Sequence, residues 1–194
     1  VGDNVGDVAG MGADLFESYV GSLISAITLA LVGSTTVGIK GAIFPISLCA
    51  AGILGSIAAT FFVKGKEGSD PQKALKKGEY VSTAVVIIAS FILSYSMFNR
   101  SFKGFGCVLA GLVVGTIIGE VTEIYTSDKY KSVKEIAENS KTGAGTNIIS
   151  GLAVGMKSTA IPIIIIVIGI LVSYSLFGLY GIALAAVGML STTG

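Results

Sequence analysis

Charged side chains are scarce in this chain of 194 residues: Asp, Glu, Lys and Arg make up 13% of it, and 52% is hydrophobic. Soluble domains carry about 25% charged residues, so the composition excludes an ordinary soluble domain and indicates a membrane protein. Histidine is absent, so proton transfer near neutral pH would have to use carboxylates or lysines. The net charge of +1 provides no basic field that would attract nucleic acid.

Cysteine is also rare. Cys49 and Cys107 both lie inside apolar runs, and their spacing matches neither a metal site nor a disulfide framework. We interpret both as small buried hydrophobic residues.

Long apolar runs fill most of the chain. Most reach or exceed the ~20 residues that a helix needs to cross a bilayer, and they do not alternate as barrel strands do. We therefore predict an all-α, polytopic transmembrane bundle, with residues 1–194 as a single transmembrane domain fragment. The predicted membrane helices cover approximately residues 2–33, 41–63, 80–98, 104–125, 146–176 and 178–194.

The distribution of lysines predicts how the chain is oriented in the membrane. Two linkers, residues 64–79 and 126–145, fall on the same side of the membrane if each apolar segment crosses once. The positive-inside rule places that side in the cytoplasm. The lysines concerned are Lys64, Lys66, Lys73, Lys76, Lys77, Lys129, Lys131, Lys134 and Lys141.

Four carboxylates, Asp3, Asp7, Asp14 and Glu17, interrupt the first apolar run. At about 100° per residue on an α-helix they fall at about 0°, 40°, 20° and −40°, which is one narrow stripe about 21 Å long. Acids inside a membrane helix are energetically unfavourable, and an ion or proton path is the default interpretation.

The four acids form two pairs with different expected roles. Asp3 and Asp7 are one turn apart at the predicted cytoplasmic end, a spacing compatible with Mg²⁺, and one of them could act as general base on a water molecule. Alternatively, both favour the positive end of the helix dipole. Asp14 and Glu17 lie deeper and would repel each other if both were ionised, which suits a gate occupied in turn by H⁺, Na⁺ or a basic side chain. Alternatively, they form a structural ion pair with another helix.

The segment that contains the four acids resembles a known family. Residues 3–16 read Asp-Asn-Val-Gly-Asp-Val-Ala-Gly-Met-Gly-Ala-Asp-Leu-Phe, which resembles the signature of membrane-integral, ion-pumping inorganic pyrophosphatases. Two later stretches resemble the same family: residues 125–138, which begin with Tyr-Thr-Ser and end with Ile-Ala-Glu, and residues 146–156 (Thr-Asn-Ile-Ile-Ser-Gly-Leu-Ala-Val-Gly-Met). The resemblance implies a homodimer of sixteen-helix subunits that hydrolyses pyrophosphate and exports H⁺ or Na⁺. This chain would be an internal fragment of such a subunit.

The resemblance also implies roles for the acids. Asp3 and Asp7 would line the cytoplasmic site where Mg²⁺ holds pyrophosphate, and Asp7 would orient the attacking water with a partner outside this chain. Asp14 would lie in the coupling funnel and Glu17 at the ion gate. Glu17 directly follows Phe16, as in the sodium-pumping branch, whereas the plant-type proton pumps carry their Glu four positions later. Na⁺ and K⁺ are candidate activators, and the determinant of K⁺ dependence would lie elsewhere.

The sequence thus predicts an integral, multi-pass enzyme in a prokaryotic cell membrane, with its active site facing the cytoplasm and no nucleic-acid partner. It would hydrolyse pyrophosphate and export Na⁺ or H⁺. The main alternative is a secondary cation or proton transporter, or a channel, without hydrolysis, which would explain the buried acids equally well. That alternative leaves the spacing of Asp3 and Asp7 unexplained.

Overall fold

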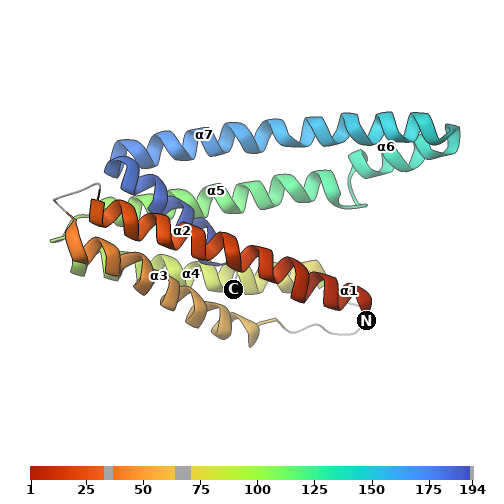
Figure 1. The fold of residues 1–194 in the computed structure, drawn as a ribbon. Coiled ribbons are helices and arrows are strands. Elements are labelled where there is room, and N and C mark those ends of the chain that lie inside the picture. Colours follow the sequence, from red (N-terminus) through yellow and green to blue (C-terminus); the bar gives the residue numbers. More distant parts are fainter. Residues whose placement is uncertain (33–36, 64–70, 193–194) are drawn as a thin grey trace. The chain divides into compact units, whose positions relative to one another are not determined.

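The computed structural model describes residues 1–32, 37–63 and 71–192, and the side chains of Asn4, Asp7, Val8 and residues 71–73 lie outside that description. The described residues form helices and turns, with no strand among them. The elements in chain order are α1 (Gly2–Val5), the π-helical η1 (Gly6–Met11), α2 (Gly12–Val32), α3 (Gly38–Thr60), α4 (Pro71–Met97), α5 (Lys103–Thr126), α6 (Lys131–Asn139), the 3₁₀-helical η2 (Ser140–Thr142) and α7 (Ala144–Leu190) (Figure 1).

The predicted all-α membrane fold is confirmed. Within the described ranges, 5 helical stretches are long and apolar enough to cross a membrane. They are Ala9–Val32, Gly38–Thr60, Ala74–Met97, Lys103–Thr142 and Ala144–Leu190. The last of these contains a break where Phe177 (φ −146°, ψ 23°) and Gly178 (φ 62°, ψ −150°) leave the helical conformation. A positive φ is strained for most residues, and glycine adopts it readily.

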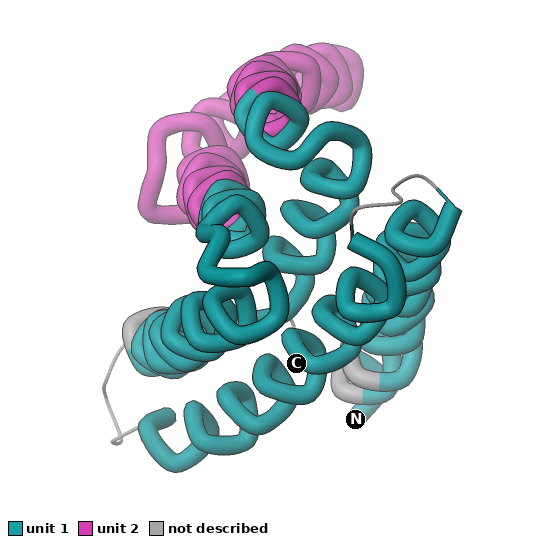
Figure 2. The backbone as a smooth tube through the Cα atoms, turned by 90° about the vertical axis from the view of Figure 1, so that its left-hand side faces the viewer, with its two compact units in different colours: residues 1–112, 172–194 teal, residues 113–171 magenta. Residues whose placement is uncertain are grey.

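The chain divides into two compact units (Figure 2). Unit 1 contains Val1–Leu112 and Val172–Gly194, and unit 2 contains Val113–Leu171. Both α5 and α7 pass from one unit to the other, so each unit is described separately below.

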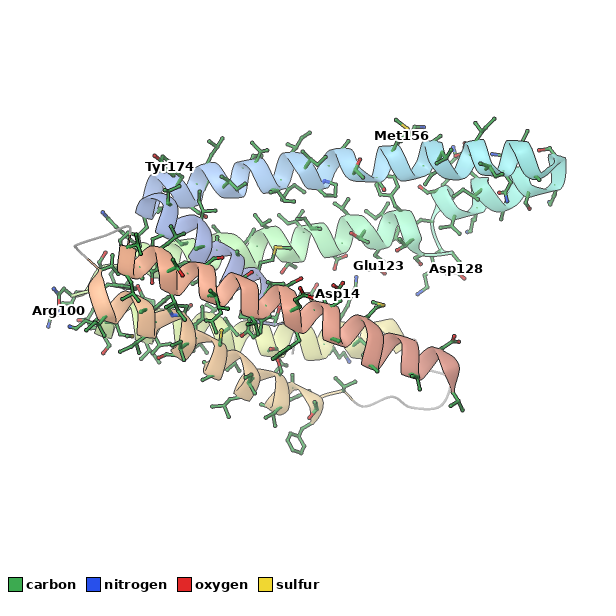
Figure 3. The ribbon with its side chains drawn as sticks, in the orientation of Figure 1. Asp14, Arg100, Glu123, Asp128, Met156 and Tyr174 are labelled. Carbon is green, nitrogen blue, oxygen red and sulfur yellow. The ribbon has the colours of Figure 1, made fainter. Side chains whose placement is uncertain are left out.

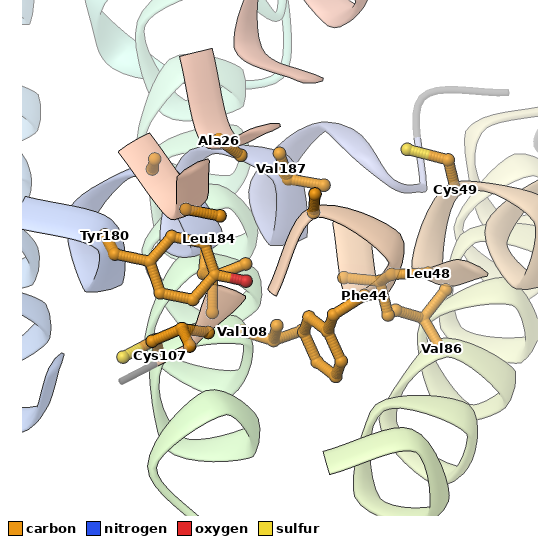
Figure 4. Packing of buried hydrophobic residues seen from close by; sticks show 14 of the residues in the cluster. Ala26, Phe44, Leu48, Cys49, Val86, Cys107, Val108, Tyr180, Leu184 and Val187 are labelled. Atoms are coloured by element: carbon orange, nitrogen blue, oxygen red, sulfur yellow. The ribbon is translucent and has the colours of Figure 1, made fainter. Parts of the chain in front are cut away.

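Unit 1 has a buried core, to which five helices contribute. α3 contacts both α2 and α4, and the last part of α7 packs on the first part of α5. A side chain at Gly111 of α5 would collide with the backbone of Ala185 in α7, so this close approach requires glycine. Ala30 is fully buried. The other buried side chains include Ala26, Phe44, Leu48, Val86, Cys107, Val108, Tyr180, Leu184 and Val187 (Figure 4). Cys49 and Cys107 are buried free thiols, as their apolar surroundings in the sequence predicted.

A fully buried serine holds the connection between α4 and α5. The hydroxyl of Ser94 donates to the carbonyl of Ser101 (2.9 Å) and accepts from the backbone N–H of Phe105 (3.1 Å). The first N–H groups of a helix have no partner within it, and unpaired groups are unfavourable in an apolar environment. Ser94 therefore caps the first turn of α5.

Unit 2 consists of the end of α5, α6, η2 and the first part of α7. The Asn139 side-chain amide donates to the hydroxyl of Ser150 (2.9 Å), which ties the end of α6 to α7. Many apolar side chains on α7 are exposed, including Ile149 at 68% and Met156 at 77%. Exposed apolar surface of this extent is expected to be covered by lipid or by other protein.

Candidate functional site

The acid-bearing segment is not a uniform α-helix. Between α1, which carries Asp3, and α2, which carries Asp14, the six residues Gly6–Met11 form the π-helix η1. Hydrogen bonds from i to i+5 wind the backbone less per residue than an α-helix does, and such turns are frequent at functional sites. The alignment of all four acids on one stripe assumed a constant 100° per residue, so it does not apply across η1.

Asp14 and Glu17 share one face of α2. Both lie after η1, three residues apart, and side chains at this spacing are neighbours on a helix. Both side chains are exposed, and Asp14 projects from α2 in Figure 3. The structure therefore brings this predicted pair together.

The opposite face of α2 packs into the unit 1 core. Ala26 and Ala30 are fully buried, and Tyr19, Leu23 and Ile27 pack against the same cluster. At about 100° per residue, these five residues centre roughly 190° away from the midpoint of Asp14 and Glu17. The acid face of α2 therefore points away from α3.

Within unit 1, open space surrounds the glycines beside the acids. A side chain added at Gly2, Gly6, Gly10 or Gly12 would meet no atom within 4 Å among the described residues. Within the same described part of the chain, no ion pair involves Asp3, Asp14 or Glu17.

Asp3 lies exposed on α1, whereas the side chain of Asp7, the other candidate of this pair, falls outside the described part of the structure. Among the described side chains, no three His, Cys, Asp or Glu residues gather closely enough to hold a metal ion. Carboxylate oxygens are the ligand type that Mg²⁺ prefers. This segment could therefore contribute part of a magnesium site, completed by ligands from elsewhere.

Unit 2 contains a cavity that the sequence did not predict. Its volume is about 270 Å³, and it lies between α5, α6 and α7. Both stretches quoted above for their resemblance, residues 125–138 and 146–156, contribute to its lining. The lining residues are Thr122, Tyr125, Thr126, Ile136, Gly151, Val154, Gly155 and Ser158. Only three-dimensional packing reveals that these separate stretches surround one space.

The whole chain, residues 1–194, matches the family described as inorganic H⁺ pyrophosphatase. The chain belongs to this family. The predicted family resemblance is thereby confirmed, since the match extends beyond the first acidic segment to the later stretches around the unit 2 cavity.

Relatives of the chain in this family differ in the ion that their names state. The chain is 55% identical to a Clostridium tetani protein that bears the name of a K⁺-stimulated pyrophosphate-energized sodium pump. It is 45% identical to "K(+)-insensitive pyrophosphate-energized proton pump 2" of Moorella thermoacetica and 43% identical to a K⁺-insensitive pyrophosphate-energized proton pump of Caldanaerobacter subterraneus. Each match covers at least 99% of this chain but spans only 30% of the relative's length.

Proposed function

We propose that the full-length protein hydrolyses pyrophosphate and couples this reaction to the export of Na⁺ from the cytoplasm. Family membership and the names of the relatives support the reaction class. The structural observation that carries the proposal is the pair Asp14 and Glu17, two carboxylates on an uncovered face of a helix that is apolar enough to cross a membrane. Ionisable residues in such helices mark ion paths.

Asp3 and Asp7 would act at the hydrolytic site. Their two carboxylates would help to hold Mg²⁺, which when bound neutralises charge on the phosphate oxygens. Asp7 would orient the attacking water and accept its proton, together with an acid from outside this chain. Pyrophosphate would bind at this end of α1 and η1.

Asp14 and Glu17 would carry the transported ion. Two neighbouring carboxylates in a poorly hydrated path repel each other, and a cation between them relieves that repulsion. Na⁺ is favoured by the position of Glu17 directly after Phe16 and by the 55% identity to a relative that bears a sodium pump's name. H⁺ is the alternative cargo, as the names of the other two relatives indicate. K⁺ and Na⁺ would act as activators.

The protein is an integral membrane protein, and we assign its lysine-rich linkers to the cytoplasmic side. The described lysines of this side lie near the start of α4 and after the end of α5, and the positive-inside rule supports the assignment. The hydrolytic residues at the start of the chain would then face the cytoplasm of a prokaryotic cell. A homodimer, with both subunits in the lipid bilayer, completes the proposal.

The test is pyrophosphate-driven uptake of Na⁺ into inverted vesicles that carry the full-length protein, with a protonophore present. Uptake that survives the protonophore supports a primary sodium pump. Acidification of the vesicle lumen without Na⁺ uptake, measured with the protonophore omitted, would reassign the cargo to H⁺. If pyrophosphate drives neither movement, the proposal is wrong and a transporter without hydrolysis becomes the better interpretation.

A further inference from the structure

The structure contains a hydrogen bond between two distant helices at a proline. Pro45 lies inside α3 and is almost completely buried. Proline has no backbone N–H, so it cannot donate the helical hydrogen bond to the carbonyl four residues earlier, which is that of Gly41. An unpaired carbonyl in an apolar core is unfavourable, because no water is present to replace the missing donor.

Tyr180 of α7 supplies a donor to this carbonyl. Its hydroxyl donates to the Gly41 carbonyl at 2.7 Å, although the two residues are 139 positions apart in the chain. The Tyr180 side chain is 4% exposed and lies among the buried residues of the unit 1 core (Figure 4). The same bond satisfies the tyrosine hydroxyl, which would otherwise be buried without a partner.

Aromatic rings hold Tyr180 in this position. The Tyr180 ring meets that of Phe177 edge to face at 5.4 Å, and Phe177 meets Phe98 in the same way at 5.5 Å. Phe98 in turn lies 4.9 Å from Phe44, the residue before Pro45. These ring contacts connect Tyr180, beside the break in α7, to Phe44 in α3. Packing of the rings therefore orients the Tyr180 hydroxyl towards α3.

Gly41, whose carbonyl accepts this bond, also lies close to α2. A side chain at Gly41 would collide with Val37 and would come within 3.2 Å of Ala30 in α2, so α2 and α3 are in close contact here. Ala30 lies thirteen residues after Glu17, which corresponds to about 20 Å along the helix. The bond therefore fastens the α2–α3 pair to α7 at the end remote from the acids.

We propose that Tyr180 is a positioning residue that replaces the hydrogen bond missing at Pro45 and makes the Gly41 end of the α2–α3 pair its fixed end. Any movement of α2 during ion transfer would then take place at the Asp14 and Glu17 end. The first part of this inference needs only the fold. The second part rests on the proposed function, because it concerns ion transfer.

A double-mutant cycle in the full-length protein tests whether Tyr180 replaces the hydrogen bond missing at Pro45. Tyr180→Phe removes only the hydroxyl, and Pro45→Ala gives the Gly41 carbonyl an N–H donor within α3. We expect Y180F to lower the thermal unfolding midpoint more than Tyr174→Phe, which makes the same change at an exposed tyrosine of α7. In the P45A background the effect of Y180F should fall to half or less, because the carbonyl no longer depends on Tyr180.

Equal effects of Y180F in both backgrounds, or an effect no larger than that of Y174F, would overturn the first part. If Y180F alone yields no folded protein, recovery of folded protein in the double variant supports the inference, and its failure to recover overturns it. None of these measurements requires pyrophosphatase activity, so they remain decisive even if the proposed function is wrong.

The second part is tested by transport. At a temperature where Y180F is folded, we expect the number of ions moved per pyrophosphate hydrolysed to fall by about twofold or more, with KM for pyrophosphate unchanged. The P45A/Y180F double variant should recover the ratio of P45A alone. A ratio in Y180F equal to that of Y174F would overturn the role in coupling.

Discussion

Asp14 and Glu17 are carboxylates in a helix that is otherwise apolar enough to cross a membrane. An ionised Asp near the centre of a membrane helix is unfavourable by about 3 kcal/mol on insertion scales. Both side chains lie opposite the face of α2 that packs into the core, so neither stabilises the packing of unit 1. At the scale of single residues, their chemistry is therefore the property that needs a functional explanation.

Asp7→Asn should abolish most hydrolysis in the full-length protein. The amide cannot accept a proton from the attacking water, and loss of a positioned general base reduces the rate by about 100-fold or more. The assay is phosphate release from pyrophosphate, with Asp128→Asn as control, because Asp128 is an exposed acid beyond the end of α5. If D7N released phosphate as fast as D128N, Asp7 would have no place in the hydrolytic site.

Residue types in the sequence were sufficient to find Asp14 and Glu17 and to predict that they share a helix face. They were not sufficient to find Ser94 or the contact between Tyr180 and Gly41. The partners of these residues depend on packing and, for Tyr180, on a residue 139 positions away in the chain. The proline in the interior of α3 was the available signal, since a proline beyond the first turn of a helix leaves a carbonyl that needs another donor.

At the scale of elements, hydropathy predicted where membrane helices occur because a helix satisfies its own backbone hydrogen bonds in an apolar solvent, so a long apolar run can cross as a helix. It did not predict η1, since hydropathy carries no information on whether a helix winds as α or π. Nor did it predict the short amphipathic helix α6, whose nine residues lie in a polar linker and are too few to produce an apolar run.

Gly111→Ala should destabilise the protein. The added methyl group would collide with the backbone of Ala185, and overpacking of this kind is unfavourable by about 1–3 kcal/mol. Gly119→Ala is the matched control in the same helix, because a side chain there meets no described atom within 4 Å. Thermal unfolding of the two purified variants provides the comparison. Unfolding midpoints that are equal for G111A and G119A would show that α5 and α7 are not in close contact at Gly111.

At the scale of the whole molecule, the lysine distribution predicts on which side of the membrane each connection lies. Ser101 follows α4, and Ser140 lies between α6 and α7, so a single α5 crossing separates them. We expect Ser140→Cys to react with a membrane-impermeant thiol reagent from the cytoplasmic side and Ser101→Cys from the opposite side. Cys49 and Cys107 are buried, so neither should react, and the protein without either substitution measures any other background. Labelling of both positions from one side would refute the predicted orientation.

The most direct test of the central claim, that the acid face of α2 lies on the ion path, is the number of Na⁺ ions taken up per pyrophosphate hydrolysed. Glu17→Gln keeps the size of the side chain and removes its charge, and Glu135→Gln on the exposed surface of α6 is the control. We predict that E17Q still hydrolyses pyrophosphate but takes up far fewer ions per turnover than E135Q. An E17Q variant that transports at the unaltered ratio would contradict the assignment of Glu17 to the gate.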